Sequence, residues 1–362
     1  MISLRQLTGV ACRTLCILVL FACETGEDRP RIRAVLVKEV VPRDSEGGLE
    51  IRDALVLRDQ STIAAITDDG KALALLSWTS PLVRPLGRYG GGPGEYSRLT
   101  HLVDDDGGFV AVDAGNSRLL QWTAGGTFVK FREIAMSPIV GAWRTDSGIV
   151  IRVGDALRMK LNFVLFPALR QGKRTFRQTP MAFLSSDTSC SYCPVAVSKR
   201  GALALAPSDT SYRIGRYDIR GIRIRSIHRN GIPIVALSPS DRDSLKVLTD
   251  RSIRFLRTQK SISSSELAIA IRAASMQLVK PRFVSPGLFF DEVERLWVQR
   301  NVASGADAEI DVFDANGDLR ATVVLPSGCK MIGVRNNRVL AIRTLTDGLS
   351  AIAEFLVNAA DL

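Results

Sequence analysis

Three cysteines in the body of the chain have the residue type and spacing for redox, metal or disulfide chemistry. Cys190 and Cys193 form a C-x-x-C pair, and Cys329 stands alone. The C-x-x-C spacing occurs in dithiol redox sites and in half of a zinc site, but no second Cys or His pair and no βαβ pattern accompanies it here. We therefore predict a structural disulfide, either between Cys190 and Cys193 or between one of them and Cys329.

Residues that could hold a catalytic metal are few. Zinc chemistry needs several imidazoles or thiolates that converge, whereas the chain has two histidines, His101 and His228. The acidic run 314–318 lacks the glycine position and the distal glutamate of an EF-hand, and both it and the run 104–106 are typical of hairpin turns. No Gly-x-Ser-x-Gly elbow is present. The sequence thus predicts no metal, no cofactor and no identifiable catalytic residue.

The N-terminus has the pattern of an export signal. Arg5 and Arg13 precede the apolar run 15–22, which is too short to span a membrane as a permanent helix. The run ends in Leu20-Phe21-Ala22-Cys23, which resembles the bacterial lipobox. The resemblance implies a signal peptide over residues 1–22, acylation of Cys23 and a tether over residues 23–31, with ordinary secretion as the alternative. An exported protein enters an oxidising compartment, which favours the disulfide.

Composition is compatible with a large core and a basic surface. Hydrophobic residues make up 46% and charged residues 23% of the chain. The formal net charge of +11 falls to +9 when the two arginines of residues 1–22 leave with the signal. Such a surface favours anionic partners, and the scattered basic residues of an exported chain argue against nucleic acid. We expect a protein or an anionic component of the bacterial cell envelope as partner, and a membrane bound through the N-terminal lipid.

A repeated pattern of short strands dominates the chain beyond residue 30. Alternating apolar runs separated by Gly, Asp and Asn predict antiparallel strands. In the clearest unit, 99–134, four such strands are joined by tight turns, as in one blade of a β-propeller. The unit recurs at 283–324 and 195–228, with fainter copies at about 50–86, 139–177 and 330–358. These six copies predict an all-β, six-bladed β-propeller over residues 32–362.

Two segments fall outside the repeats. Residues 32–41 are left over before the first unit while the last unit lacks a strand, so we predict that they close the ring beside residues 350–357. Ser238 and Pro239 look like a helix N-cap and first turn, and leucines at near-helical spacing and an alanine-rich run follow. We therefore predict a helical insertion at 239–278 between blades four and five, which caps one face of the disc.

The stretch from Leu86 to Tyr96, followed by Val110 to Arg118, resembles an NHL-type repeat. It is similar to the six-bladed β-propeller proteins found among exported bacterial lipoproteins. The resemblance implies a fold and an exported setting, because many members of that family have no established activity. The motif residues are Gly90, Gly91, Gly92, Pro93, Gly94, Glu95, Asp113, Asn116 and Arg118.

Turn chemistry explains these motif residues. The glycines permit backbone angles that other residues avoid, and Pro93 fixes one dihedral. Asp113 and Asn116 suit a turn in which their side chains bond backbone amides, and Arg118 can pair with an acid. The glycine run is not a phosphate loop, because it lacks the Gly-Lys-Ser/Thr ending and a following helix.

Two functions from different classes follow. The sequence favours a binding or scaffold module with an unnamed ligand, whose affinity resides in loops or in the helical insertion. The alternative is a channel-centred metal-dependent hydrolase or lyase of the NHL or lactonase propeller type. That alternative needs acids from several inner strands to converge on a metal, and His101, just before an inner strand, is the histidine placed to approach the channel.

Overall fold

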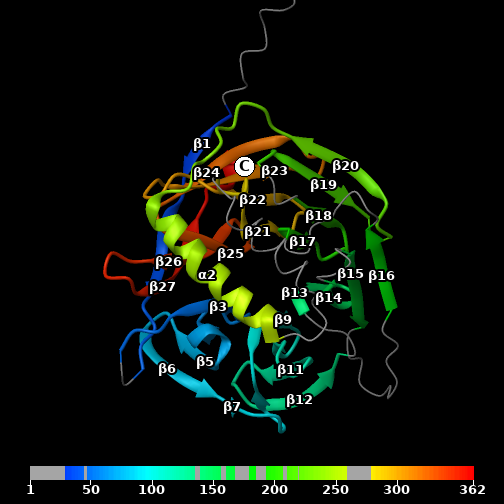
Figure 1. Cartoon of the computed structure of the whole chain (residues 1–362), viewed down its shortest axis with the longest axis vertical. Coiled ribbons are helices and arrows are strands. Elements are labelled where there is room, and N and C mark those ends of the chain that lie inside the picture. Colours follow the sequence, from blue (N-terminus) through cyan, green and yellow to red (C-terminus); the bar gives the residue numbers. More distant parts are fainter. Residues whose placement is uncertain are drawn as a thin grey trace, which may run out of the picture.

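Six sheets account for most of the described residues, and in each of them three or four consecutive strands pair in antiparallel order. The structure is a computed structural model that describes residues 29–44, 47–134, 139–155, 160–167, 179–184, 193–206, 210–218, 220–258 and 279–362. The sheets are arranged as blades around a common axis, with the first strand of each blade innermost (Figure 1). The fold is therefore the predicted six-bladed β-propeller.

The first three blades lie between residues 51 and 184. Blade 1 comprises β3 (Ile51–Val56), β4 (Thr62–Thr67), β5 (Ala72–Ser77) and β6 (Ser80–Leu86); blade 2 comprises β9 (Leu99–Asp105), β10 (Gly108–Asp113), β11 (Arg118–Thr123) and β12 (Phe128–Glu133); blade 3 comprises β13 (Ile139–Thr145), β14 (Gly148–Asp155), β15 (Lys160–Pro167) and β16 (Thr179–Leu184). The short parallel pair β7 (Arg88–Tyr89) and β8 (Glu95–Tyr96) links blades 1 and 2, and a 3-10 turn, η1 (Asp68–Gly70), joins β4 to β5.

The remaining blades complete the ring. Blade 4 comprises β17 (Val195–Val197), β18 (Leu203–Leu205), β19 (Arg213–Tyr217) and β20 (Arg223–His228); blade 5 comprises β21 (Phe283–Phe290), β22 (Leu296–Arg300), β23 (Ala308–Phe313) and β24 (Leu319–Leu325); blade 6 comprises β25 (Cys329–Arg335), β26 (Arg338–Thr344) and β27 (Ser350–Leu356). A last 3-10 turn, η2, spans Ala359–Asp361. Blade 3 extends beyond the predicted limit of residue 177. Its outer strand β16 was not predicted because it contains Pro180, a residue tolerated only at a sheet edge.

The N-terminal segment closes the ring and does more than predicted. Strand β2 (Val35–Val40) pairs with β27 as the outer strand of blade 6, which confirms the predicted closure. A further strand, β1 (Arg31–Arg33), pairs in parallel with β24 and gives blade 5 a fifth strand. The predicted limit between tether and propeller, at residues 31 and 32, falls inside β1. The alternation explains this strand, because Ile32 enters the core between blades 5 and 6 while its arginine neighbours stay exposed.

The one helix longer than a turn in the described ranges, α2 (Pro239–Thr258), lies between β20 and β21 and runs across the face of the disc that is turned to the viewer (Figure 1). Its start is a capping box: Ser238 Oγ accepts from the Asp241 backbone N–H at 3.1 Å, and Asp241 Oδ2 accepts from the Ser238 N–H at 2.9 Å. The predicted insertion is thus confirmed for residues 239–258. Its predicted continuation, 259–278, lies outside the described residues.

The core is divided among the six junctions between neighbouring blades. Successive residues of a middle strand serve opposite junctions: Trp297 packs towards blade 6, whereas Leu296 and Val298 pack towards blade 4. Because both faces of each blade are covered, consecutive residues of a middle strand are buried, as in β10 and β22, where every residue is buried. In the part of the chain that the structure describes, no helix is long and apolar enough to cross a membrane.

Candidate functional site

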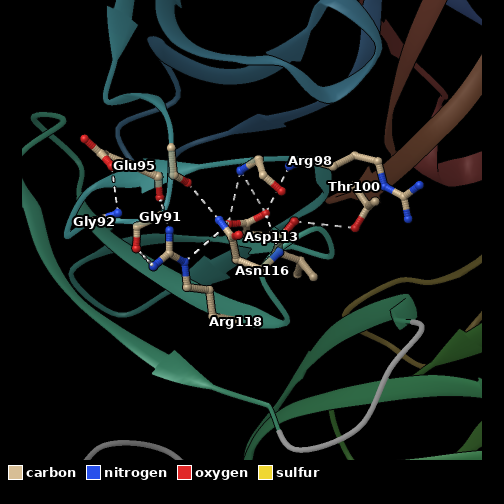
Figure 2. A network of polar contacts seen from close by, with 11 residues as sticks. Gly91, Gly92, Glu95, Arg98, Thr100, Asp113, Asn116 and Arg118 are labelled. Atoms are coloured by element: carbon tan, nitrogen blue, oxygen red, sulfur yellow. Dashed lines mark hydrogen bonds and ion pairs between the residues drawn. The ribbon is translucent and has the colours of Figure 1, made fainter.

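The glycine motif and the aspartate turn of blade 2 meet on one face of the disc. We call this the upper face; it is the face at which the innermost strand of each blade begins. Asp113, at the end of β10, is fully buried. Its Oδ1 accepts from the backbone N–H groups of Arg98 at 3.0 Å, Ser97 at 3.2 Å and Asn116 at 3.3 Å (Figure 2). This carboxylate therefore holds the loop that leads into β9.

Arg118 and Asn116 bind the glycine loop itself. The Arg118 guanidinium lies 3.3 Å from Asp113 Oδ2 and donates to the carbonyl oxygens of Gly91 at 2.8 Å and Glu95 at 2.6 Å (Figure 2). Asn116 Nδ2 donates to the carbonyl of Gly90 at 2.9 Å. The donor groups of these two side chains bind the glycine loop, so their role is structural.

Glu95 closes the loop from the solvent side. Its carboxylate accepts from the Gly92 N–H and from Arg88 Nε, both at 2.7 Å, and these bonds lower the pKa of Glu95. Gly90 has φ of +154°, a backbone conformation that residues with side chains rarely adopt, so this position favours glycine. The structure thus brings the predicted motif residues together in one network, and a direct ligand role for them stays untested.

A second group of polar residues lies on the innermost strands of blades 6, 1 and 2. Asp53 on β3 accepts from the backbone N–H of Leu102 at 2.8 Å and of Ala54 at 3.0 Å. Burial raises the pKa of Asp53 to about 7, although both amides and the Lys330 ammonium on β25 oppose the shift. His101 lies on β9, and burial, together with the charges of Arg52 and Lys330, lowers its pKa to about 4. His101 is therefore neutral at physiological pH.

This channel group does not match the metal donor set that the alternative function needs. It combines one carboxylate and one imidazole with a lysine whose ammonium interacts with Asp53, whereas zinc sites use three or four Cys, His or carboxylate ligands. Among the described residues, no group of three or more His, Cys, Asp or Glu could hold a metal ion. Sequence reasoning placed His101 near the channel but missed Asp53 and Lys330, which sit in ordinary alternating strands without a motif.

A pocket of about 500 Å³ opens on the upper face at the boundary of blades 4 and 5. Its described lining includes three arginines and a histidine and no carboxylate. The lining residues are Thr210, Ser211, Tyr212, Arg213, His228, Arg229, Asn230, Gly231, Ile232 and Arg282. We call this the arginine pocket.

Arg282 ties the two walls of the arginine pocket together. Its Nε and Nη2 donate to the carbonyl oxygen of Thr210 at 3.0 and 2.7 Å, and its Nη1 donates to the carbonyl of Pro233 at 2.6 Å. Thr210 precedes β19, and Pro233 belongs to the connection that carries α2. These bonds fix the guanidinium in the wall of the pocket.

Arg229 is fixed by a carboxylate of the next blade. Its Nη1 lies 2.7 Å from Oδ1 of Asp311, a fully buried residue of β23. The same carboxylate accepts from the Tyr212 hydroxyl at 2.6 Å and from the Thr322 hydroxyl at 2.8 Å, and Arg300 Nε lies 3.0 Å away. Burial raises the pKa of Tyr212 well above its ordinary value of 10, so this hydroxyl remains a donor.

Sequence reasoning missed the arginine pocket. It placed His228 correctly at the end of an outer strand but gave it no role. In the structure β19 and β20 pair with Arg213 opposite His228, which brings a cation and an imidazole to the pocket rim. Pairing the predicted strands of this hairpin would have revealed the cluster, whereas the contribution of Arg282 depends on the connection that folds back after α2.

The structure tests one of the two predicted disulfide pairings, the one that involves Cys329. Cys329 is a free thiol buried in the core between blades 5 and 6, and burial raises its pKa to about 12. A bridge from Cys190 or Cys193 to Cys329 is therefore wrong, because Cys329 packs among apolar side chains of its own blade junction. Cys190 and the predicted lipid site Cys23 lie outside the described residues. The Cys190–Cys193 pairing stays a prediction.

Comparison with known proteins gives structural neighbours. No family model matches the sequence, and no curated protein matches it. A member of the duf4221 family from Bacteroides vulgatus is 10% identical with a TM-score of 0.51, over 91% of this chain and 99% of that one. The likeness is one of fold. A protein described as exported, from Bacteroides fragilis, is 13% identical at a TM-score of 0.46 over 91% and 99% of the two chains. A catalytically inactive virginiamycin B lyase from Staphylococcus aureus is 10% identical at 0.46 over 90% of each chain.

Proposed function

We propose that the protein is an exported, lipid-anchored binding module that takes an anionic group of a cell-envelope component into the arginine pocket. The observation that carries the proposal is the fixed arrangement of cations around a cavity of about 500 Å³. Cavities of roughly 300–1,000 Å³ accommodate small ligands or ligand groups. A phosphate or carboxylate is the complementary chemistry, because guanidinium groups bind both through paired hydrogen bonds.

Preorganisation supports this function. Arg282 is held by two carbonyl oxygens, and Arg229 by the buried carboxylate of Asp311. A ligand that enters therefore meets donors that have already lost their conformational freedom, which lowers the entropic cost of binding. The net positive charge of the mature chain would also speed encounter with a polyanion.

The helical insertion and the arginine pocket share one connection. Residues 229–232 precede α2 and Arg282 follows the insertion, so the pocket lies at its base. The base is closed by an isolated bridge between Ala236 and Val279 and by an ion pair of 3.0 Å between Lys280 Nζ and Asp241 Oδ1. This placement supports the expectation that affinity resides in the insertion and in the loops around it.

Titration calorimetry with inorganic phosphate tests the binding proposal. Arg213→Gln removes an exposed cation from the pocket wall, and we expect phosphate to bind roughly ten-fold more weakly. Arg223→Gln is the matched control, because Arg223 is an exposed arginine of the same sheet that does not line the pocket. Equal losses in both variants would reduce the binding to general charge attraction and contradict the proposal.

Acyl labelling tests the anchor separately. Cys23→Ser removes the thiol that the lipobox resemblance assigns to acylation, so we expect fatty-acid incorporation to stop and the protein to leave the membrane fraction. Cys329→Ser is the control for unspecific thiol acylation, because Cys329 is buried. Unchanged labelling of the Cys23→Ser variant would remove the lipid anchor from the proposal and leave the arginine pocket as it is.

A further inference from the structure

The outer strand of blade 6 begins with three consecutive exposed aliphatic residues. Val35, Leu36 and Val37 of β2 are 64%, 43% and 42% exposed. Leu356 of β27, the cross-strand partner of Val35, is 40% exposed. We call these four residues the rim patch. An edge strand with such a run on the surface of a soluble domain indicates contact with an apolar partner.

The geometry of β2 argues against another β-strand as that partner. The pairing register shifts between Leu36 and Lys38, so Val37 sits in a β-bulge. A bulge followed by a lysine disrupts the regular row of backbone donors and acceptors that an added strand needs. We therefore expect a partner to contact the apolar side chains of the rim patch and not to add a strand to the backbone of β2.

The rim patch lies close in the sequence to Cys23, the predicted lipid site, and this indicates a membrane as its partner. Eight residue steps separate Cys23 from Arg31, where β1 begins, and a chain of that length spans at most about 29 Å. Because β2 follows β1 after one residue, an acyl anchor at Cys23 would keep the rim patch within reach of the bilayer surface. A second exposed aliphatic pair, Ile224 of β20 and Ile222 just before that strand, belongs to blade 4, and β20 lies on the other side of the disc from β27 (Figure 1).

The segment that carries the rim patch is rich in basic residues. Residues 29–38 contain four basic side chains, Arg29, Arg31, Arg33 and Lys38, and no acidic one. Arg31 and Arg33 are 65% and 74% exposed and are held on the rim by ion pairs with Glu309 and Asp307 of blade 5. Basic residues beside exposed aliphatic ones are the composition of segments that lie in a membrane interface.

We propose that the propeller stands on its rim, with the rim patch seated in the interface of an anionic membrane. The proposal rests on the proposed export and acylation, which bring this edge to the bilayer. A disc that stands on edge leaves its upper face accessible, so the arginine pocket stays open to a partner from the side. The rim patch adds a second, weaker attachment to the acyl chains, and interfacial attachments of this kind are reversible by themselves.

Vesicle co-sedimentation tests the rim patch without the lipid. The chain from residue 23 onward with Cys23→Ser is mixed with vesicles of phosphatidylethanolamine and phosphatidylglycerol. We expect it to bind, and we expect Val35→Ser with Val37→Ser to lower the partition coefficient about five-fold or more. Ile222→Ser with Ile224→Ser is the matched control and should bind as the parent does. Circular dichroism confirms that both double variants keep the β-sheet signal.

Each other outcome overturns the membrane as the partner. A parent that stays in the supernatant, or equal losses in both double variants, shows that the rim patch does not select the bilayer. Loss of binding together with a change from dimer to monomer in light scattering assigns the patch to a second copy of the chain. Acyl labelling of the wild type reports the anchor in a separate assay, so failure of the rim proposal is distinguishable from failure of lipidation.

Discussion

Two buried aspartates on the propeller, Asp113 in blade 2 and Asp311 in blade 5, each hold an arginine, but the networks around them differ in reach. Asp113 binds backbone N–H groups of the segment that leads into β9 of its own blade, and Arg118 gives its remaining donors to carbonyl oxygens of the same segment. Asp311 instead binds side chains of blades 4 and 5, among them Tyr212, 99 residues away in the sequence.

The difference lies in what remains for a ligand. The donors of Arg118 are used on Asp113, Gly91 and Glu95, so the blade 2 network is closed. Arg229 contacts Asp311 and lies over the Tyr212 ring, but its side chain is 26% exposed and lines the arginine pocket. A buried aspartate therefore supports a binding site only where the arginine that it holds still reaches solvent.

Removing the two carboxylates should separate stability from binding. Asp113→Ala leaves Arg118 buried without its partner, and we expect a loss of about 3–5 kcal/mol in the free energy of unfolding with phosphate affinity unchanged. Asp311→Ala should cost about as much and also abolish phosphate binding, because Arg229 loses its anchor. Chemical denaturation and calorimetry measure the two effects. If Asp311→Ala does not fold, Asp311→Asn serves in its place; loss of phosphate binding in Asp113→Ala would break the comparison.

The channel residues Asp53 and His101 make the free energy of unfolding depend on pH, so the variants of Asp113 and Asp311 must be compared at one pH. The raised pKa of Asp53 favours folding at low pH, and this contribution declines as pH rises from 3.8 to about 7, by up to about 4 kcal/mol. The lowered pKa of His101 acts in the opposite sense, because its contribution is full above pH 6.5 and is lost as pH falls to about 4. The two slopes therefore offset each other between about pH 4 and 6.5.

Single substitutions expose each slope. We expect the stability of Asp53→Asn to rise with pH between about 4 and 6.5, and that of His101→Gln to fall over the same range, while the wild type stays nearly flat. Denaturant titrations at several pH values measure this. Parallel curves for the wild type and both variants would show that neither group has a shifted pKa.

The fold could be predicted because its signals are local. Each blade consists of strands joined by tight turns, so alternation and turn residues within about forty positions define it. The closure by β2 followed from the rule that an open ring exposes strand edges. Strand β1 was missed because three residues, two of them arginines, give too short a pattern, and β16 was obscured by Pro180.

The candidate site could be predicted much less well. The turn network of Asp113, Asn116 and Arg118 is readable because its members lie within five residues of one another. The arginine pocket depends on contacts over 72 residues between Arg282 and Thr210 and over 99 between Tyr212 and Asp311. The channel group depends on which strands become neighbours around the axis, since Lys330 and Asp53 meet only because the last and first blades close the ring. No periodic pattern in the sequence indicates these long-range contacts.

An intermediate effect is expected from the hydroxyl that links the two sides of the pocket wall. Tyr212→Phe removes the 2.6 Å hydrogen bond to Asp311 and keeps the ring, so it should lower the free energy of unfolding by about 1.5–3 kcal/mol. Phosphate affinity should fall a few-fold, because Asp311 then holds Arg229 less firmly. Tyr96→Phe is the control: its hydroxyl is also buried and bonded, to Leu86 O and Leu73 N, but far from the pocket. An equal drop in phosphate affinity in both variants would contradict a specific role for Tyr212.

The smallest effect is expected on the outside of the glycine loop. Arg88 is 82% exposed and pairs with Glu95 at 2.7 Å. Exposed ion pairs contribute little, so Arg88→Gln should change the free energy of unfolding by less than about 0.5 kcal/mol. The loop should also stay resistant to limited proteolysis, because the Gly92 N–H still binds the Glu95 carboxylate and Arg118 still binds the loop carbonyls. Asn116→Ala is the inner counterpart; it removes the bond to the Gly90 carbonyl and should cost about 1 kcal/mol. The opposite result would be a larger loss in the free energy of unfolding for Arg88→Gln than for Asn116→Ala, together with proteolysis of the loop. It would show that the loop is held from its solvent side, and the contrast between the blade 2 network and the arginine pocket would fail.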